Sequence, residues 1–324
     1  MTKFIKKLYL GWSPRRGNPR IWESFNVPHL MINAYDFRNR TQPISAAKLP
    51  LNFRGEIFCD SGGYQILNGC HNISAHQIIE LQAQMGASIN AVLDNALNYR
   101  EHIRNLETYI SYAQKNPSLQ FVPVVPHNLP KKYLKIMVDL FPHPPIIAIG
   151  NVVPSLYPLS DHGNLLSVLQ HIQSIKEFFP KSRVHVFGLG GLTTAALFFY
   201  LIDSTDSTAW IHDARYGKLR ILGGGIARTT RPKSVVSFLK KNSCSCPACG
   251  KDDEYLLSAR GAIGTELRAL HNAWVVLREL DLLNASFLNG TYDEYVSQRV
   301  HGSHWHRNLL QAVRRIVSNT NGSR

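Results

Sequence analysis

The stretch Glu56-Ile-Phe-Cys-Asp-Ser-Gly-Gly-Tyr-Gln65 sets the pattern that decides the fold. A short apolar run at 56–59 predicts a buried strand, which ends at an aspartate followed by two glycines. The segment Ala75–Met85 then predicts a helix, because Ser74 and Gln77 have the spacing of a capping box. A strand followed by a helix is the repeating unit of parallel sheets, in which the helix carries the chain back to the starting edge.

The same alternation continues as far as residue 206. Each further apolar run ends at a polar residue, a proline or a glycine, and helical segments lie between the runs. Strands are predicted at 89–93, 120–125, 145–149, 183–187 and 201–202, and helices at 103–114, 165–179 and 193–200. This order fits a (β/α)8 TIM-type barrel or a doubly wound sheet, and both folds place the binding site at the carboxyl ends of the strands.

The composition is that of a globular protein with an anionic partner. The 324 residues are 44% hydrophobic, which is enough for one large or two ordinary domains. There are 36 Lys and Arg against 22 Asp and Glu, and the formal net charge is +14. Such an excess indicates a polyanion such as nucleic acid, although a protein that is merely basic is the alternative.

No apolar run is long enough for a signal peptide or a membrane span, so we expect no membrane partner. Cys59 and Cys70 are expected to be reduced, which indicates a cytoplasmic protein. We divide the chain into a basic N-terminal segment with short strands at 1–55, a barrel core at 56–240, and a C-terminal part at 241–324. A basic amphipathic helix at 305–317 is expected to cover the barrel or to contact nucleic acid.

The C-terminal part carries a metal-binding motif. Cys244-Ser-Cys246-Pro-Ala-Cys249 places three thiols within six residues, and His271 lies on a predicted helix further along the chain. Three cysteines and one histidine form a closed tetrahedral set for Zn²⁺, which is structural rather than catalytic. The alternative is three ordinary thiols and a helix histidine. We therefore expect a zinc-binding subdomain, with the chemistry located elsewhere.

Three aspartates lie at predicted strand ends: Asp60, Asp94 and Asp206. A single aspartate there is often only the cap of the next helix. Three of them in a chain poor in acidic residues favour a reactive site, and paired carboxylates suit glycosyl transfer through a nucleophile and a proton carrier. The glycines after Asp60 let the backbone approach a planar ligand, and Tyr64 offers a ring for stacking.

These motifs together resemble the tRNA-guanine transglycosylase family. Asp60-Ser-Gly-Gly-Tyr-Gln65 is similar to its DSGGFQ signature, and Val92-Leu-Asp94 occupies the place of the next aspartate of its base pocket. Ile202-Asp-Ser-Thr-Asp206 is similar to the segment that ends in its nucleophile. Cys244, Cys246, Cys249 and His271 match its zinc motif. The order and rough spacing hold from about residue 55 to 280.

The resemblance implies a (β/α)8 barrel with a structural zinc subdomain, and an enzyme that exchanges guanine in a polynucleotide for a free 7-deazaguanine base. Asp206 is then the nucleophile, Asp60 the general acid and base, and Asp94 a hydrogen-bond acceptor for the purine. Asp203 and Asp213 are neighbouring candidates for the nucleophile. The base pocket implied by the resemblance also includes Ser61, Gly62, Gly63, Tyr64, His127, Gly150 and Gly188.

The chain also departs from the bacterial tRNA enzymes of that family. Ser207-Thr-Ala-Trp-Ile-His-Asp-Ala-Arg215 replaces their anticodon-reading segment, and Pro126-His-Asn128 replaces their pocket Gln-Gly-Gly. His127 either substitutes for the lost glutamine or is a structural loop histidine. This pattern resembles the divergent branch that inserts 7-deazaguanine into DNA, so we expect DNA as the substrate, with tRNA as the alternative. A homodimer or accessory proteins are possible partners.

Two functions of other classes compete with base exchange. A non-catalytic nucleic-acid-binding subunit would lack the nucleophile, whereas Asp206 is present. A glycosidase acting on free nucleosides would have no use for a net charge of +14.

Overall fold

The structure is a computed structural model that describes most of the chain. The described residues are 5–15, 17–38, 53–69, 73–127, 129–152, 162–189, 191–223, 225–228, 244–249 and 261–322. Cys70 and Asn128 lie outside these residues, as does most of 229–260.

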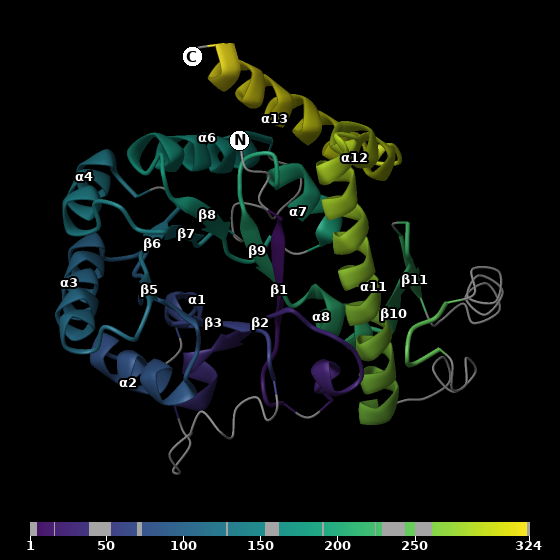
Figure 1. Ribbon diagram of the computed structural model, residues 1–324, viewed down its shortest axis with the longest axis horizontal. Coiled ribbons are helices and arrows are strands. Elements are labelled where there is room, and N and C mark those ends of the chain that lie inside the picture. The colour runs from purple at the N-terminus through teal and green to yellow at the C-terminus, as the bar shows by residue number, and fades with distance from the viewer. Residues whose placement is uncertain are drawn as a thin grey trace.

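One parallel sheet forms the centre of the molecule (Figure 1). Its strands follow the order β5-β4-β3-β2-β1-β9-β8-β7-β6, and every pairing within it is parallel. The strands are β1 (Lys7–Gly11), β2 (His29–Asn33), β3 (Glu56–Asp60), β4 (Ile89–Ala91), β5 (Phe121–Val122), β6 (Val124–Pro126), β7 (Ile146–Gly150), β8 (Arg183–Val186) and β9 (Ser204–Ser207).

The sheet closes on itself through Pro123. The strands β5 and β6 stand at the two ends of the sheet order, but Pro123 alone separates them in the chain. On one side Val92 N donates to Val122 O over 3.0 Å, and on the other Ala148 N donates to Pro123 O over 2.9 Å. The two short strands therefore fill one position, and the nine strands make a barrel of eight positions. The predicted (β/α)8 barrel is confirmed.

The barrel begins earlier than the sequence analysis placed its start. The strand β1 pairs with β9 on one side and β2 on the other, so two barrel strands come from the segment 1–55 rather than from 56–240. In both strands the apolar runs are short and are interrupted by other residue types. Four of their side chains are fully buried: Leu8, Leu10, Leu30 and Ile32. Because the surrounding loops are rich in Arg, Asn and Pro, the segment as a whole does not have the apolar pattern of barrel strands. The three-part division of the chain otherwise stays a prediction.

Helices surround the barrel (Figure 1). The predicted capping box of α2 is present, since Ser74 N donates to Gln77 Oε1 over 2.9 Å and Gln77 N donates to Ser74 Oγ over 3.3 Å. The helices that follow the strands are α1 (Gly63–Leu67), α2 (Ala75–Met85), α3 (Tyr99–Lys115), α4 (Lys131–Leu140), α6 (His162–Phe178), α7 (Leu192–Phe198) and α8 (Ala209–Arg215), and two 3-10 turns are η1 (Ile21–Glu23) and η2 (Ala34–Phe37).

The barrel interior is packed rather than hollow. A cluster of inward-facing side chains fills it, separate from the larger core between the strands and the outer helices. Its members are Tyr9, Met31, Phe58, Ile89, Ala91, Val122, Val124, Ile146 and Ala148, with Phe187 against them. This layer closes the barrel below the strand ends, so that a ligand can enter only at its rim.

The C-terminal part packs along one side of the barrel (Figure 1). It comprises the antiparallel pair β10 (Lys218–Arg220) and β11 (Ile226–Arg228) and the helices α11 (Gly261–Asn289), α12 (Tyr292–Val300) and α13 (His304–Gly322). Helix α11 contacts α8 and β10, and α12 and α13 contact α7. Leu309, Leu310 and Val313 of α13 are buried, as expected of a helix that covers the barrel. Within the described residues, no helix combines the length and apolarity needed to cross a bilayer.

Candidate active site

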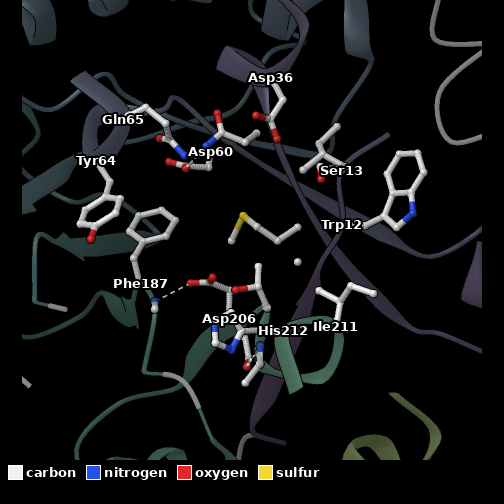
Figure 2. A pocket seen from close by; sticks show the side chains of 18 of the residues that line it. Trp12, Ser13, Asp36, Asp60, Tyr64, Gln65, Phe187, Asp206, Ile211 and His212 are labelled. Carbon is white, nitrogen blue, oxygen red and sulfur yellow. Dashed lines mark hydrogen bonds between the residues drawn. The ribbon is translucent and has the colours of Figure 1, made fainter. Parts of the chain in front are cut away.

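A cavity of about 620 Å³ opens at the carboxyl ends of the barrel strands. Asp60 at the end of β3, Asp94 after β4 and Asp206 in β9 all line it. Figure 2 shows Asp60 and Asp206 on opposite walls, with the rings of Tyr64 and Phe187 to one side. The three aspartates that the sequence places at strand ends are thus brought into one cavity.

Asp60 is held with its proton available near neutral pH. Burial raises the pKa of its carboxyl to about 7, and the negative charges of Asp94 and Asp206 add to the rise. Asn33 Nδ2 donates to Asp60 Oδ2 over 2.8 Å, which fixes the orientation of the carboxyl group. A carboxyl with a pKa near the working pH can both give and take a proton, as general acid–base catalysis requires.

Asp94 is seated between two glycines. A Cβ added to Gly63 would lie 1.9 Å from Asp94 Oδ1, and one added to Gly150 would lie 2.8 Å from Asp94 Oδ2. No other residue could stand at either position without displacing the carboxylate. Burial raises the pKa of Asp94 to about 6, so the group is mostly an anionic acceptor at pH 7.

Asp206 is anchored by one of its two oxygens. Gly188 N donates to Asp206 Oδ1 over 2.8 Å, the contact drawn as a dashed line in Figure 2. Among the described residues, no hydrogen bond to the other oxygen, Oδ2, is present. The carboxylate is therefore oriented while keeping one oxygen available to a ligand.

Neither neighbouring aspartate shares this cavity. Asp203 precedes β9, where its Oδ2 accepts from Val184 N over 2.9 Å and its Oδ1 lies 3.6 Å from Lys6 Nζ. Asp213 of α8 forms a 2.6 Å ion pair with Arg220. Both are used in structural contacts, and of the three candidates for the nucleophile only Asp206 lines the cavity.

Two predicted pocket residues build the cavity without lining it. Ser61 is buried, and its Oγ donates to Val92 O over 3.3 Å, which ties the end of β3 to the end of β4. Gly62 has φ +88°, and a Cβ there would lie 2.4 Å from Tyr35 Cβ. The Ser-Gly-Gly residues of this signature thus mainly allow the tight turn that follows Asp60. Tyr64, Gly150 and Gly188 line the cavity, and their contact with a base stays a prediction.

His127 does not line the cavity. It is 4% exposed, and its ring packs edge-on against His171 of α6 at a centroid distance of 5.4 Å. Its Nε2 lies 3.4 Å from Ser167 Oγ. The structural alternative left open for this histidine therefore fits the geometry, and the role in base recognition does not.

The polar rim of the cavity was not predicted from the sequence. Arg15 and Asn18 come from the loop after β1, and Arg215 comes from α8. Arg215 Nη2 donates to Asn18 Oδ1 over 2.7 Å, and Arg15 pairs with Asp36 over 3.1 Å. These residues gather only because β1 pairs with β9, which no local sequence pattern reveals.

Three lining residues have buried polar atoms without a hydrogen-bond partner within the described part of the chain. They are Trp12 Nε1, Gln65 Oε1 and Asn151 Oδ1. Asn151 has φ 56°, a strained value for a residue with a side chain. Because buried polar groups are nearly always paired, these atoms indicate a polar ligand in the cavity.

The metal motif forms a cluster away from the cavity. The Sγ atoms of Cys244, Cys246 and Cys249 lie 3.7, 3.3 and 3.3 Å from His271 Nδ1, and all four ligand atoms lie within 4.8 Å of one another. His271 Nε2 lies 2.8 Å from Arg220 O and donates to it, so Nδ1 presents its lone pair to the sulfurs. This donor set and its supporting contact fit structural Zn²⁺.

The cluster joins the C-terminal part to the barrel. Asn272, next to His271, accepts from Arg220 N over 2.7 Å and donates to Trp210 O over 3.1 Å. The ligands on the 244–249 segment and on α11 are thereby linked to β10 and α8, and α8 lies directly after Asp206. The set is closed by four protein ligands, which leaves no open position for a substrate.

Comparison with known proteins places these features in a family. A family model described as queuine tRNA-ribosyltransferase matches residues 23–304. The chain is 26% identical to a tRNA-guanine(15) transglycosylase of Methanococcus aeolicus over 290 residues, which is 82% of this chain and 42% of that protein. It is 25% identical to the protein of the same name from Pyrococcus furiosus over 289 residues, covering 82% of this chain and 45% of that protein.

The chain spans about half the length of the curated relatives it matches. The match to the family model, in contrast, covers both the barrel and the metal-binding cluster. On that basis the resemblance seen in the sequence is confirmed, and the chain belongs to the queuine tRNA-ribosyltransferase family.

Proposed function

We propose that this chain is a pentosyltransferase that exchanges guanine in a polynucleotide for another purine-like base. The observation that supports it best is the meeting of Asp60, Asp94 and Asp206 in one cavity at the carboxyl end of the barrel. The three groups have different environments, as different roles in one reaction require. A non-catalytic role is less consistent with the nucleophile candidate, which is present and oriented.

The first step is a displacement at the ribosyl carbon. Asp206 Oδ2 attacks that carbon on the face opposite the base, the carbon–nitrogen bond to guanine breaks, and an ester links sugar and enzyme. Asp60 donates the proton that the departing guanine takes up. The target nucleotide must leave its stack to reach the cavity, and the basic protein holds the backbone meanwhile.

The second step reverses the first with a different base. Asp60, now ionised, removes a proton from the incoming base, whose nitrogen attacks the ester carbon and frees Asp206. Two inversions retain the configuration at the sugar. Asp94 accepts hydrogen bonds from the N–H groups on the pyrimidine edge of the purine. Its seat between Gly63 and Gly150 supports this role, because the carboxylate has little freedom to turn away.

The zinc has no part in these steps. Cys244, Cys246, Cys249 and His271 would hold it, and it would supply only cross-linking of the 244–249 segment to α11. We expect its loss to reduce folding or nucleic-acid docking before it reduces the chemistry.

The names of the relatives favour tRNA as the polymer, whereas the departures in sequence favour DNA. Both named relatives are tRNA-guanine transglycosylases, which favours tRNA and runs against the sequence-based preference for DNA. The preference for DNA rests on the segments after Asp206 and Pro126, and it stays a prediction. The incoming base, a 7-deazaguanine, and any homodimer or accessory protein are likewise predictions.

Incorporation of labelled guanine tests the proposal. The protein is incubated with radiolabelled guanine and, separately, unmodified tRNA and double-stranded or single-stranded DNA. Label in acid-precipitable polymer is the expected result, and the polymer that takes up label identifies the substrate. Absence of label from all three polymers, with zinc bound and the protein folded, would overturn base exchange. Release of guanine from free nucleosides at any salt concentration would favour a nucleoside glycosidase instead.

A further inference from the structure

A buried histidine lies directly beneath the nucleophile candidate. His185 of β8 is 0% exposed, and its Nε2 lies 3.7 Å from Asp206 Oδ1. Its other nitrogen, Nδ1, lies 2.9 Å from Ser204 Oγ. Ser204 and Asp206 are two residues apart on β9, so both face the same side of the sheet as the imidazole. The three residues form a chain that runs from the barrel interior to the cavity.

The surroundings of His185 are otherwise apolar. Its ring packs against Tyr9, Phe58 and Phe187, with centroid distances of 5.7, 4.7 and 4.6 Å. Burial lowers the pKa of His185, although Asp206 opposes the shift, so the ring is neutral at pH 7. A neutral imidazole in such a place is costly unless both nitrogens are used.

The position of its single proton follows from electrostatics. If the proton were on Nδ1, the lone pair of Nε2 would face the Asp206 carboxylate and be repelled by it. With the proton on Nε2, the N–H dipole points at the carboxylate, and the Ser204 hydroxyl donates to Nδ1. The second arrangement pairs Nδ1 with Ser204 as the donor and directs the Nε2–H at Asp206 Oδ1. At 3.7 Å this is an electrostatic contact rather than a full hydrogen bond, and within the described residues Nε2 has no hydrogen-bond partner.

From these contacts we infer that His185, oriented by Ser204, is a positioning residue that holds Asp206 Oδ1 and thereby directs Oδ2 to the sugar. Gly188 N and His185 Nε2 approach the same oxygen. The other oxygen is left as the attacking atom. A neutral donor orients the carboxylate without neutralising it, as a cation would. The inference rests on the proposed function, which makes Asp206 the nucleophile.

The test compares variants of this chain in the exchange assay. His185→Phe keeps an aromatic ring among Tyr9, Phe58 and Phe187 and removes the donor. We expect its kcat to fall about 10- to 100-fold with KM changed less than about threefold, since a lost donor at a reacting carboxylate costs mainly in the chemical step. His185→Gln, which retains an N–H, should recover part of that loss. Ser204→Ala should lower kcat less than His185→Phe.

A matched control separates positioning from packing. His102 of α3 is also 0% exposed, and it lies outside the cavity lining. His102→Phe should keep its kcat at equal folded fraction. A His185→Phe variant that retains the wild-type kcat, or a His185→Gln variant no better than His185→Phe, would overturn the inference.

A spectroscopic measurement keeps the inference testable apart from activity. Nitrogen-15 NMR of the imidazole reports which ring nitrogen carries the proton. We expect the Nε2–H form for His185 in the wild type and a mixture of forms in Ser204→Ala. The Nδ1–H form in the wild type would contradict the inference even if exchange occurs. Failure of exchange with the Nε2–H form present would instead count against the proposed function.

Discussion

The two ends of strand β3 carry carboxylates whose surroundings shift their pKa values in opposite directions. Glu56 stands at the amino end, where it accepts from Lys7 Nζ over 2.9 and 3.0 Å and from the Tyr9 hydroxyl. Asp60 stands at the carboxyl end, where Asp94 and Asp206 are near and the described residues provide no cation partner. Burial raises the pKa of both groups. At Glu56 the hydrogen bonds and the Lys7 charge outweigh it and the pKa is lowered, whereas at Asp60 the pKa rises to about 7.

The difference separates a carboxylate used for stability from one kept for chemistry. A compensated charge at the amino end of a barrel stabilises the fold. Three uncompensated carboxylates at the other end cost stability, and natural proteins retain such an arrangement where function requires it. Replacing the carboxylate at the carboxyl end should therefore reduce activity and raise stability. Replacing the one at the amino end should leave activity unchanged and lower stability.

The largest effect is expected at Asp206. Asp206→Asn should lower the exchange rate by about 10⁴-fold or more, because the amide cannot form the ester with the sugar. Asp203→Asn is the matched control: it lies three residues earlier, at the opposite end of β9, and pairs with Lys6. It should keep its exchange rate. Equal losses in both variants, measured by guanine incorporation, would remove the assignment of the nucleophile.

The next effect compares the two ends of β3 directly. Asp60→Asn should reduce kcat by about 10²- to 10⁴-fold, the usual contribution of a general acid or base. Glu56→Gln should leave kcat unchanged and lower the free energy of unfolding by about 1 kcal/mol, since its ion pair is half-exposed and screened. Guanine incorporation and urea unfolding measure the two quantities. A Glu56→Gln variant with reduced kcat would show that the carboxylate at the amino end of β3 also affects catalysis.

A smaller effect, on KM for guanine, is expected when the close packing of Gly63 against the Asp94 carboxylate is disturbed. In Gly63→Ala the new methyl group would overlap Asp94 Oδ1, and the carboxylate must turn away. We expect KM for guanine to rise about tenfold, the loss of roughly one good hydrogen bond, with a lesser change in kcat. Gly191→Ala serves as control, because no atom lies within 4 Å of a Cβ added there. If both alanine variants bind guanine as the wild type does, Asp94 does not recognise the base.

The sequence predicted the parts of the molecule that are written in contiguous residues. Helix α2 was predicted at its observed bounds, and the cysteines and His271 were predicted as one cluster because their spacing is local. Short strands were expected in 1–55, but β1 and β2 were not assigned to the barrel, because five-residue strands lie between long polar loops. Arg15 and Arg215 were missed because only the pairing of β1 with β9 brings them together.

His185 illustrates a signal that was present but not used. It alternates with Val184 and Val186 in β8, so the period of two places it on the inner face of the barrel together with Phe187. A polar residue on that face, one strand away from a strand-end aspartate, indicates a contact with it. For His127 the sequence left two roles open: it follows a strand, as cavity residues do, but the turn directs it toward α6.

An effect on stability alone is expected from the pH dependence at the carboxyl end. The pKa of Asp60 is raised from 3.8 to about 7, so its protonated form is favoured in the folded state. The resulting stability is complete below pH 4 and is lost as pH rises toward 7. Glu56 has a lowered pKa and contributes no slope above pH 5.

Unfolding in urea at pH 5 and at pH 8 measures this slope. Asp60→Asn should be more stable than the wild type by about 2 kcal/mol at pH 8 and by less than half of that at pH 5, since one pKa unit is worth about 1.4 kcal/mol before solvent screening. Asp94, with a pKa raised to about 6, leaves a residual slope in the variant. The higher free energy of unfolding at pH 8 should accompany the loss of base exchange. The reason is that the buried Asp60 carboxylate, which has no cation partner in the described residues, both carries the proton of the reaction and destabilises the fold. A variant that is less stable than the wild type at pH 8 would mean that the Asp60 carboxylate is compensated after all.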